Sequence, residues 1–134
     1  MKSVRYLKTL NKPALIGQVK INITNLRLRT YIGFNPEEKT KQQDVIVNAE
    51  IHYRADSAFT NDNEKDVLNY KSITKRMINH IETGRFKLLE KLTAELLAIA
   101  SADEQVSFAE VRVDKPHALR FADSVSVTLS ATRP

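Results

Sequence analysis

Four segments of the chain alternate apolar and polar residues with the period of two that is typical of β-strands. They cover residues 20–32, 45–53, 109–113 and 125–129. In the first segment Ile21 and Ile23 share one phase whereas Leu26 and Leu28 share the other, so we predict a β-bulge near Asn25. The first two segments, separated by a polar loop, are expected to pair as an antiparallel hairpin.

Two amphipathic helices are predicted between the second and third strands. Asn69 is a suitable N-cap for the first, which ends at Gly84. The second covers residues 88–102, and the short link between the helices favours an antiparallel pair. The apolar stripes of the two helices comprise Ile73, Met77, Ile78 and Ile81 in the first, and Leu89, Leu92, Leu96 and Ile99 in the second.

The element order ββααββ predicts an α+β protein, with an antiparallel four-stranded sheet and two antiparallel helices on one face. Such a sheet has two open edges, and pairing of the edges of neighbouring copies would close it into a ring or barrel. We therefore expect a homo-oligomer with cyclic symmetry. Residues 1–18 show no sustained periodicity and are interpreted as an N-terminal extension, with a single domain over residues 19–134.

Composition excludes several kinds of site. The chain has no cysteine, which excludes disulfides and thiolate chemistry, and its three histidines are too far apart for metal-ligand spacing. The acidic segment 62–66 resembles a calcium loop, but Val67 stands where a glycine is required. With three glycines there is no glycine-rich phosphate loop. A zinc site built from histidine and carboxylate side chains stays open as the less favoured alternative, and we expect no metal.

Charge and hydropathy suggest the compartment and the partner. No segment is apolar enough for a signal peptide or a membrane helix, so we expect a cytoplasmic protein with no membrane partner. The net charge of +5 indicates an anionic partner. Because the basic residues are scattered, a phosphorylated small molecule is favoured over nucleic acid.

Four polar residues stand at the ends of predicted elements, where a rigid scaffold presents functional groups. Glu38 lies in the first loop, Tyr70 and Glu90 begin the two helices, and Lys115 ends the third strand. Each has an ordinary alternative role. Glu38 could be a surface acid and Tyr70 a capping aromatic. Glu90 could complement the helix dipole, and Lys115 could be a solvated lysine. As a set they indicate a small-molecule enzyme.

The segments around these residues resemble the dihydroneopterin aldolase/epimerase family, over residues 19–130. In the order found in aldolases of the family, the chain contains Thr30-Tyr31-Ile32-Gly33 with Glu38 five residues on, Leu68-Asn69-Tyr70, Arg85-Phe86-Lys87-Leu88-Leu89-Glu90 and Asp114-Lys115-Pro116. Segments 25–30 and 117–126 are more similar to the epimerase branch, since aldolases usually have glycine in place of His117 and lack the Leu119-Arg120 pair. The resemblance implies the tunnelling fold (T-fold), with subunits in an octamer of two stacked tetrameric rings.

The implied reaction is inversion of C2′ in the side chain of 7,8-dihydroneopterin triphosphate, by retro-aldol cleavage and re-addition of the aldehyde. No cofactor or metal is implied, because the C=N bond of the dihydropterin ring accepts the electrons. The alternatives are an aldolase that releases glycolaldehyde and 6-hydroxymethyl-dihydropterin, a purine-binding relative of the same fold, and a non-catalytic basic binding module.

The resemblance also implies a role for each site residue. Lys115 would be the general base, a role for which burial or neighbouring cations lower the pKa of a lysine. Glu38, or the adjacent Glu37, would orient Lys115 or the substrate hydroxyls. The other implied roles are a proton relay by Tyr70 of a neighbouring subunit, a pterin pocket formed by the anchor Glu90 and by Leu89, and contacts of His117 and Arg120 with the substrate side chain.

Overall fold

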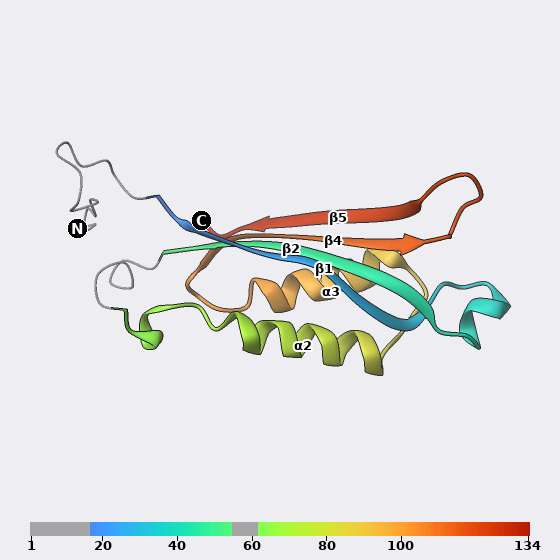
Figure 1. The fold of residues 1–134 in the computed structure, drawn as a ribbon, viewed down its shortest axis with the longest axis horizontal. Helices are drawn as coiled ribbons and strands as arrows, with labels where there is room; N and C mark the ends of the chain where they lie inside the picture. Colours follow the sequence, from blue (N-terminus) through green and yellow to red (C-terminus); the bar gives the residue numbers. More distant parts are fainter. Residues whose placement is uncertain (1–16, 55–61) are drawn as a thin grey trace.

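The computed structural model describes residues 17–54 and 62–134 (Figure 1). A five-stranded sheet covers two α-helices. In chain order the elements are β1 (Val19–Ile32), the 3-10 turn η1 (Pro36–Lys39), β2 (Gln43–Tyr53), the 3-10 turn η2 (Glu64–Asp66), α2 (Tyr70–Thr83), β3 (Arg85–Phe86), α3 (Leu89–Ala100), β4 (Val106–Pro116) and β5 (Ser124–Thr132).

The sheet has the strand order β3-β1-β2-β4-β5. The four long strands pair antiparallel with their neighbours, as the alternating pattern predicted. The sequence analysis treated residues 85–86 as part of a link, but they form the short strand β3, parallel to the end of β1. The sheet is therefore mixed. The predicted α+β class and the order of the long elements are confirmed.

The predicted bulge lies in β1 at Asn25. The register with β2 shifts between Ile23 and Leu26, and Asn25 has a φ of 54°. Asn48 of β2 holds the bulge with two hydrogen bonds, because its Oδ1 accepts from the Asn25 backbone at 2.9 Å and its Nδ2 donates to Asn25 Oδ1 at 3.2 Å. One extra residue thus keeps the apolar side chains of both halves of β1 against the core.

Both helices pack on one face of the sheet and run in opposite directions, as predicted (Figure 1). The Asn69 side chain accepts from Ser72 N at 3.0 Å, which confirms the N-cap of α2. The helices bury Ile73, Met77, Ile81, Leu92 and Leu96 against apolar residues of β2 and β4. α3 ends at Ala100, two residues before its predicted end.

Thr30 ties the end of β1 to the end of α2. Its side chain is fully buried, and its hydroxyl donates to Ile81 O at 2.6 Å. This contact brings the segment after α2, including β3, beside the end of β1. Three segments distant in the sequence, the end of β1, β3 and the loop with η1, therefore meet at one end of the molecule.

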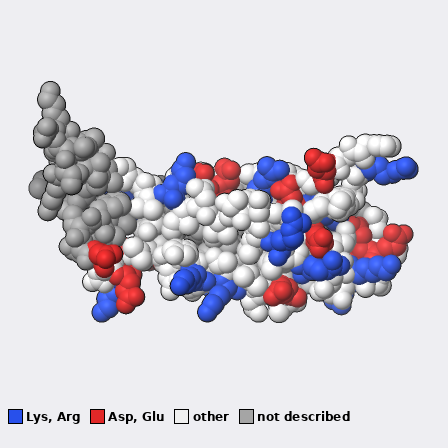
Figure 2. Space-filling view, viewed as in Figure 1, with Lys and Arg blue, Asp and Glu red and all other residues white. Residues whose placement is uncertain are grey.

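The helix-free face of the sheet is polar. Arg29 of β1 pairs with Asp44 of β2 at 3.1 Å, and Arg112 of β4 pairs with Asp114 at 2.8 Å. Acidic and basic side chains are also interspersed in the view of Figure 2. Within the described residues, no helix is long and apolar enough to cross a membrane.

Two predictions lie wholly or partly outside the described residues. The N-terminal extension was placed at residues 1–18, of which only Gly17 and Gln18 are described. The polar connection after β2 was placed at residues 56–66, and its described part contains η2, where Asn63 Oδ1 accepts from Lys65 N at 3.0 Å.

Candidate active site

Glu38 and Lys115 meet at the end of the sheet where β4 leaves for β5. The Lys115 ammonium donates to Glu38 Oε2, and the two side chains are 14% and 19% exposed respectively. This hydrogen bond is the main reason why the pKa of Glu38 lies below its usual value, although burial acts in the opposite direction. Hydrogen bonds from Gln43 and from the Asn35 backbone lower the pKa further. Glu37 is exposed, so of the two candidate acids the structure brings Glu38 to Lys115.

Gly33 makes room for the Glu38 carboxylate. Its φ is +129°, a backbone conformation that residues with a side chain rarely adopt. A Cβ built on Gly33 would lie 2.2 Å from Glu38 Cδ. Its backbone N donates to Phe86 O at 2.8 Å, which fixes the turn against β3. The missing side chain of Gly33 thus lets Glu38 fold back over the turn toward Lys115.

Gln43, the first residue of β2, supports the same carboxylate. Its Nε2 donates to Ile32 O at 2.7 Å and to Glu38 Oε2 at 3.3 Å. Glu38 Oε1 accepts from Asn35 N at 3.3 Å. Donors from three sides therefore set the direction of the carboxylate, which makes it a suitable partner for an ammonium.

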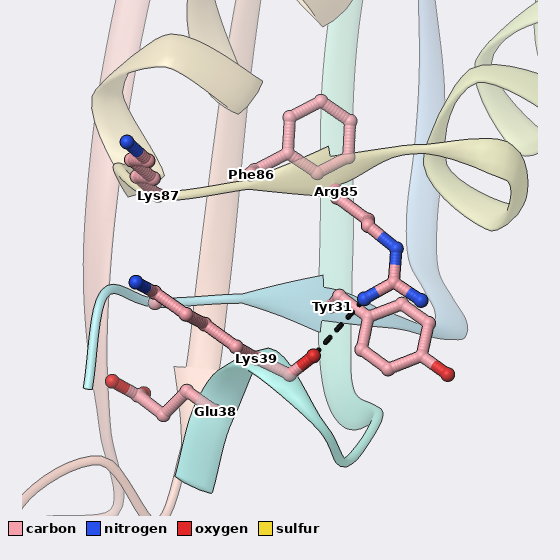
Figure 3. A pocket seen from close by; sticks show the side chains of 7 residues that line it. Tyr31, Glu38, Lys39, Arg85, Phe86 and Lys87 are labelled. Carbon is pink, nitrogen blue, oxygen red and sulfur yellow. Dashed lines mark hydrogen bonds between the residues drawn. The ribbon is translucent and has the colours of Figure 1, made fainter. Parts of the chain in front are cut away.

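A cavity of about 290 Å³ opens beside Glu38 (Figure 3). It is lined by the end of β1, η1 and β3, and its side chains are Tyr31, Glu38, Lys39, Arg85, Phe86 and Lys87. The Arg85 guanidinium lies 3.8 Å from the centre of the Tyr31 ring, and its Nη1 donates to Lys39 O at 3.0 Å. Three cations thus surround a cavity of which one wall is the Glu38 carboxylate.

Asp114 fixes the strand ends behind Lys115. It is 8% exposed, and its carboxylate accepts from Arg112 Nε at 2.8 Å and from Ser124 Oγ at 2.6 Å. Burial alone would raise the pKa of Asp114, but the hydrogen bonds from Arg112 and Ser124, with the Arg112 charge, hold it below its usual value. The corner from which Lys115 projects is therefore cross-linked between β4 and β5.

Leu89 and Glu90 begin α3, and only Leu88 separates them from the cavity residue Lys87. Leu89 is half-buried, and its carbonyl accepts from Thr93 Oγ1 at 2.7 Å. Glu90 is exposed in the first turn of the helix. Both lie at the same end of the molecule as Glu38, although neither lines the cavity.

Tyr70 lies far from this cluster within one chain. It begins α2, whose C-terminal end adjoins β3, and 14 helical residues extend over about 20 Å. Its side chain is 48% exposed. One copy of the chain therefore leaves Tyr70 apart from Glu38 and Lys115.

His117 and Arg120 lie in the loop between β4 and β5. Both are exposed, and His117 has a φ of 63° with its backbone N donating to Asp123 O at 3.4 Å. The Arg120 guanidinium lies 5.4 Å from the ring centre of Phe121, a side chain that is fully exposed. In Figure 1 the loop projects beyond the ends of β4 and β5, away from the rest of the molecule.

The sequence motifs contain Tyr31, Arg85 and Lys87 without implying a role for any of them, and no pattern in the sequence predicts a role for Lys39 or Gln43. The sequence does contain one sign of the two cations in the cavity. Arg85 and Lys87 stand on either side of the aromatic Phe86, and because Phe86 is buried, both cations lie on the exposed side. Among residues 17–54 and 62–134, no group of three His, Cys, Asp or Glu side chains gathers as metal ligands would.

Comparison with known proteins identifies the family. Residues 21–130 match the dihydroneopterin aldolase (FolB) family. The chain belongs to this family. Two of its relatives are dihydroneopterin triphosphate 2′-epimerases. That of Escherichia coli K12 is 54% identical, over 84% of this chain and 94% of the relative, and that of Pseudomonas aeruginosa is 48% identical, over 87% and 95%.

A solved family structure confirms the T-fold. Escherichia coli dihydroneopterin aldolase in complex with neopterin superposes with a TM-score of 0.79 at 26% identity, over 84% of this chain and 98% of that structure. The family resemblance inferred from the motifs is therefore confirmed. Identity to the two epimerases is about twice the identity to this aldolase, so the epimerase branch is the nearer of the two.

Proposed function

We propose that the protein is an isomerase that inverts C2′ of 7,8-dihydroneopterin triphosphate and so forms 7,8-dihydromonapterin triphosphate. One observation carries the proposal: the shielded pair of Lys115 and Glu38 stands beside an open, cation-lined cavity. The similarity to two epimerases supports inversion as the outcome. An aldolase that releases glycolaldehyde is not favoured, because the aldolase relative is more distant.

Lys115 and Glu38 supply the proton transfers. Lys115 acts as the general base that takes the proton of the 2′-hydroxyl, and the Glu38 carboxylate stabilises the resulting ammonium. The C1′–C2′ bond then breaks, its electron pair enters the C=N bond of the ring to give an enamine, and C2′ becomes an aldehyde. The retained aldehyde turns its other face to C1′, the enamine attacks it, and Lys115 returns the proton to the new hydroxyl.

The remaining residues bind the substrate in this proposal. The Glu90 carboxylate accepts hydrogen bonds from the 2-amino and N3–H groups of the ring, and Leu89 lines the pterin pocket. Tyr70 of a neighbouring subunit relays a proton to or from the enamine, while His117 and Arg120 lie near the substrate side chain. The distance of Tyr70 from Lys115 within one chain supports a site shared between subunits.

We also propose the assembly and the compartment. The two outer strands, β5 and most of β1, have one unpaired side each in a single copy. Edge-to-edge pairing would close four copies into a ring, and two stacked rings give an octamer. We place the enzyme in the cytoplasm.

The test separates the epimer from cleavage products. The protein is incubated with dihydroneopterin triphosphate, and monapterin, neopterin and 6-hydroxymethylpterin are resolved by chromatography after dephosphorylation and oxidation. We expect monapterin as the main product, and Lys115→Ala should lower turnover by about two to four orders of magnitude. Lys75→Gln, on the exposed side of α2, is the control for lost charge. Hydroxymethylpterin as the main product would make the protein an aldolase.

A further inference from the structure

We infer that Lys39 and Lys87, assisted by Arg85, form the subsite that holds the triphosphate of the substrate. This inference rests on the proposed function, since it assigns part of the same substrate to the cavity beside Glu38. It differs from the expectation for Arg120, which lies in the exposed β4–β5 loop and does not line this cavity.

The charge of the cavity lining suits a polyanion. Three of its residues are cations and one is an acid, Glu38, which is already paired with Lys115. Among the described residues, no carboxylate forms an ion pair with Lys39, Lys87 or Arg85, because the ion pairs present join other residues. The lining therefore presents positive charge without a compensating acid of its own.

The geometry of the cations also suits phosphate. Arg85 is held over the Tyr31 ring and bonded to the Lys39 carbonyl, so its guanidinium is fixed while further N–H donors stay available. In Figure 3, Lys39 and Lys87 extend on the same side as Glu38, and Arg85 lies on the opposite side with Tyr31. The cavity thus combines one fixed fork of donors with two flexible ammonium groups.

The position of the cavity matches the chemistry of the substrate. The triphosphate is carried on the carbon next to C2′, so its first phosphate must lie within a few bonds of the group that Lys115 deprotonates. The cavity meets this condition, because Glu38 is both its wall and the partner of Lys115.

The pterin ring fits the cavity lining less well. Its recognition edge consists of the 2-amino and N3–H donors, which need a free acceptor, whereas the one lining carboxylate is taken by Lys115. The 2-amino and N3–H donors of the ring would then face the N–H donors of Arg85, Lys39 and Lys87. The ring is better served by Glu90 at the start of α3, with the phosphates directed toward the lysines.

The test uses two ligands that bind without reacting, neopterin and neopterin triphosphate. Calorimetry gives the dissociation constant of each for the wild type, Lys39→Gln, Lys87→Gln and the double variant. We expect the preference for the triphosphate, the ratio of the two constants, to fall about tenfold for each lysine. Lys75→Gln is the matched control of equal net charge, and its ratio should stay within about twofold of the wild type.

A second probe, inorganic triphosphate, tests the subsite without a pterin. It should displace neopterin triphosphate from the wild type and do so at least about tenfold less well from the double variant, with the difference shrinking at high salt. An equal loss of both neopterin ligands in the lysine variants, or a preference that follows Arg120→Ala instead, would overturn the assignment. If wild-type protein bound inorganic triphosphate but neither neopterin ligand, the proposed function would fail and the anion site would stand.

Discussion

At the scale of single residues, the candidate site depends on one glycine. Glu38 reaches Lys115 because Gly33 has no side chain in the space that the carboxylate fills. The motif placed Gly33 and Glu38 five residues apart, but no periodicity predicts that they touch. The contact arises from the positive φ of Gly33 and the short turn η1, which bend the chain back on itself.

Gly33→Ala should therefore uncouple the pair. The new Cβ would force the Glu38 carboxyl group to move by more than 1 Å, and displacements of that size in an active site cost about a hundredfold in turnover. The unfavourable φ adds about 1–3 kcal/mol of strain to the folded state. Steady-state kinetics and urea unfolding measure the two effects. Gly17→Ala, with open space around the new Cβ, is the control and should change neither.

At the scale of elements, periodicity explains what could be predicted. The long strands and both helices follow from period-two and helical patterns, and the bulge at Asn25 follows from the change of phase. β3 could not be predicted, because a strand of two residues is too short to show an alternating pattern. It lies beside β1 because Thr30 holds the end of α2 there. Tyr31, Lys39 and Arg85 come from three elements and Lys87 from the link after β3, so their common cavity depends on this tertiary contact.

The β4–β5 corner should show a specific pH dependence. Because Asp114 has a folded-state pKa below its usual 3.8, its contribution to stability is present above pH 3.8 and is lost as the pH falls through the folded value. Asp114→Asn should destabilise the protein at pH 7 by about 1–3 kcal/mol, and the difference should narrow below pH 3.8. Urea unfolding at both pH values measures it. A pH-independent difference, or an equal effect of the exposed control Asp123→Asn, would contradict the assigned pair.

At the scale of the whole molecule, one copy of the chain holds an incomplete set of the proposed residues. Glu38 and Lys115 meet within the chain, whereas Tyr70 lies at the other end of α2, half-exposed. The sequence motifs named all three residues, but motifs do not state which copy supplies each one. A shared site gives the two open strand edges a functional consequence, since association would then create the active site.

Mixed assemblies test this arrangement. Lys115→Ala and Tyr70→Ala subunits should each be nearly inactive, but random rings of the two should regain activity in about a quarter of their sites, where an intact Lys115 meets a neighbour's intact Tyr70. Activity after co-refolding, with light scattering for the assembled mass, measures the recovery. Lys115→Ala mixed with Glu38→Gln is the control, and it should recover nothing because those residues belong to one chain. An active monomer would contradict the shared site.

The bulge at Asn25 is the place where the length of β1 can change by one residue without turning its side chains over. Deleting this single residue would remove the bulge and place Ile23 and Leu26 two positions apart, so that β1 would alternate regularly, with Leu26 still opposite Val47 and Leu28 still on the core side. Substitution of Asn25 would only loosen its hold on Asn48. Variants of this protein should therefore accept the loss of one residue at position 25 more readily than a loss elsewhere in β1, which would turn half of the side chains of the strand to the opposite face.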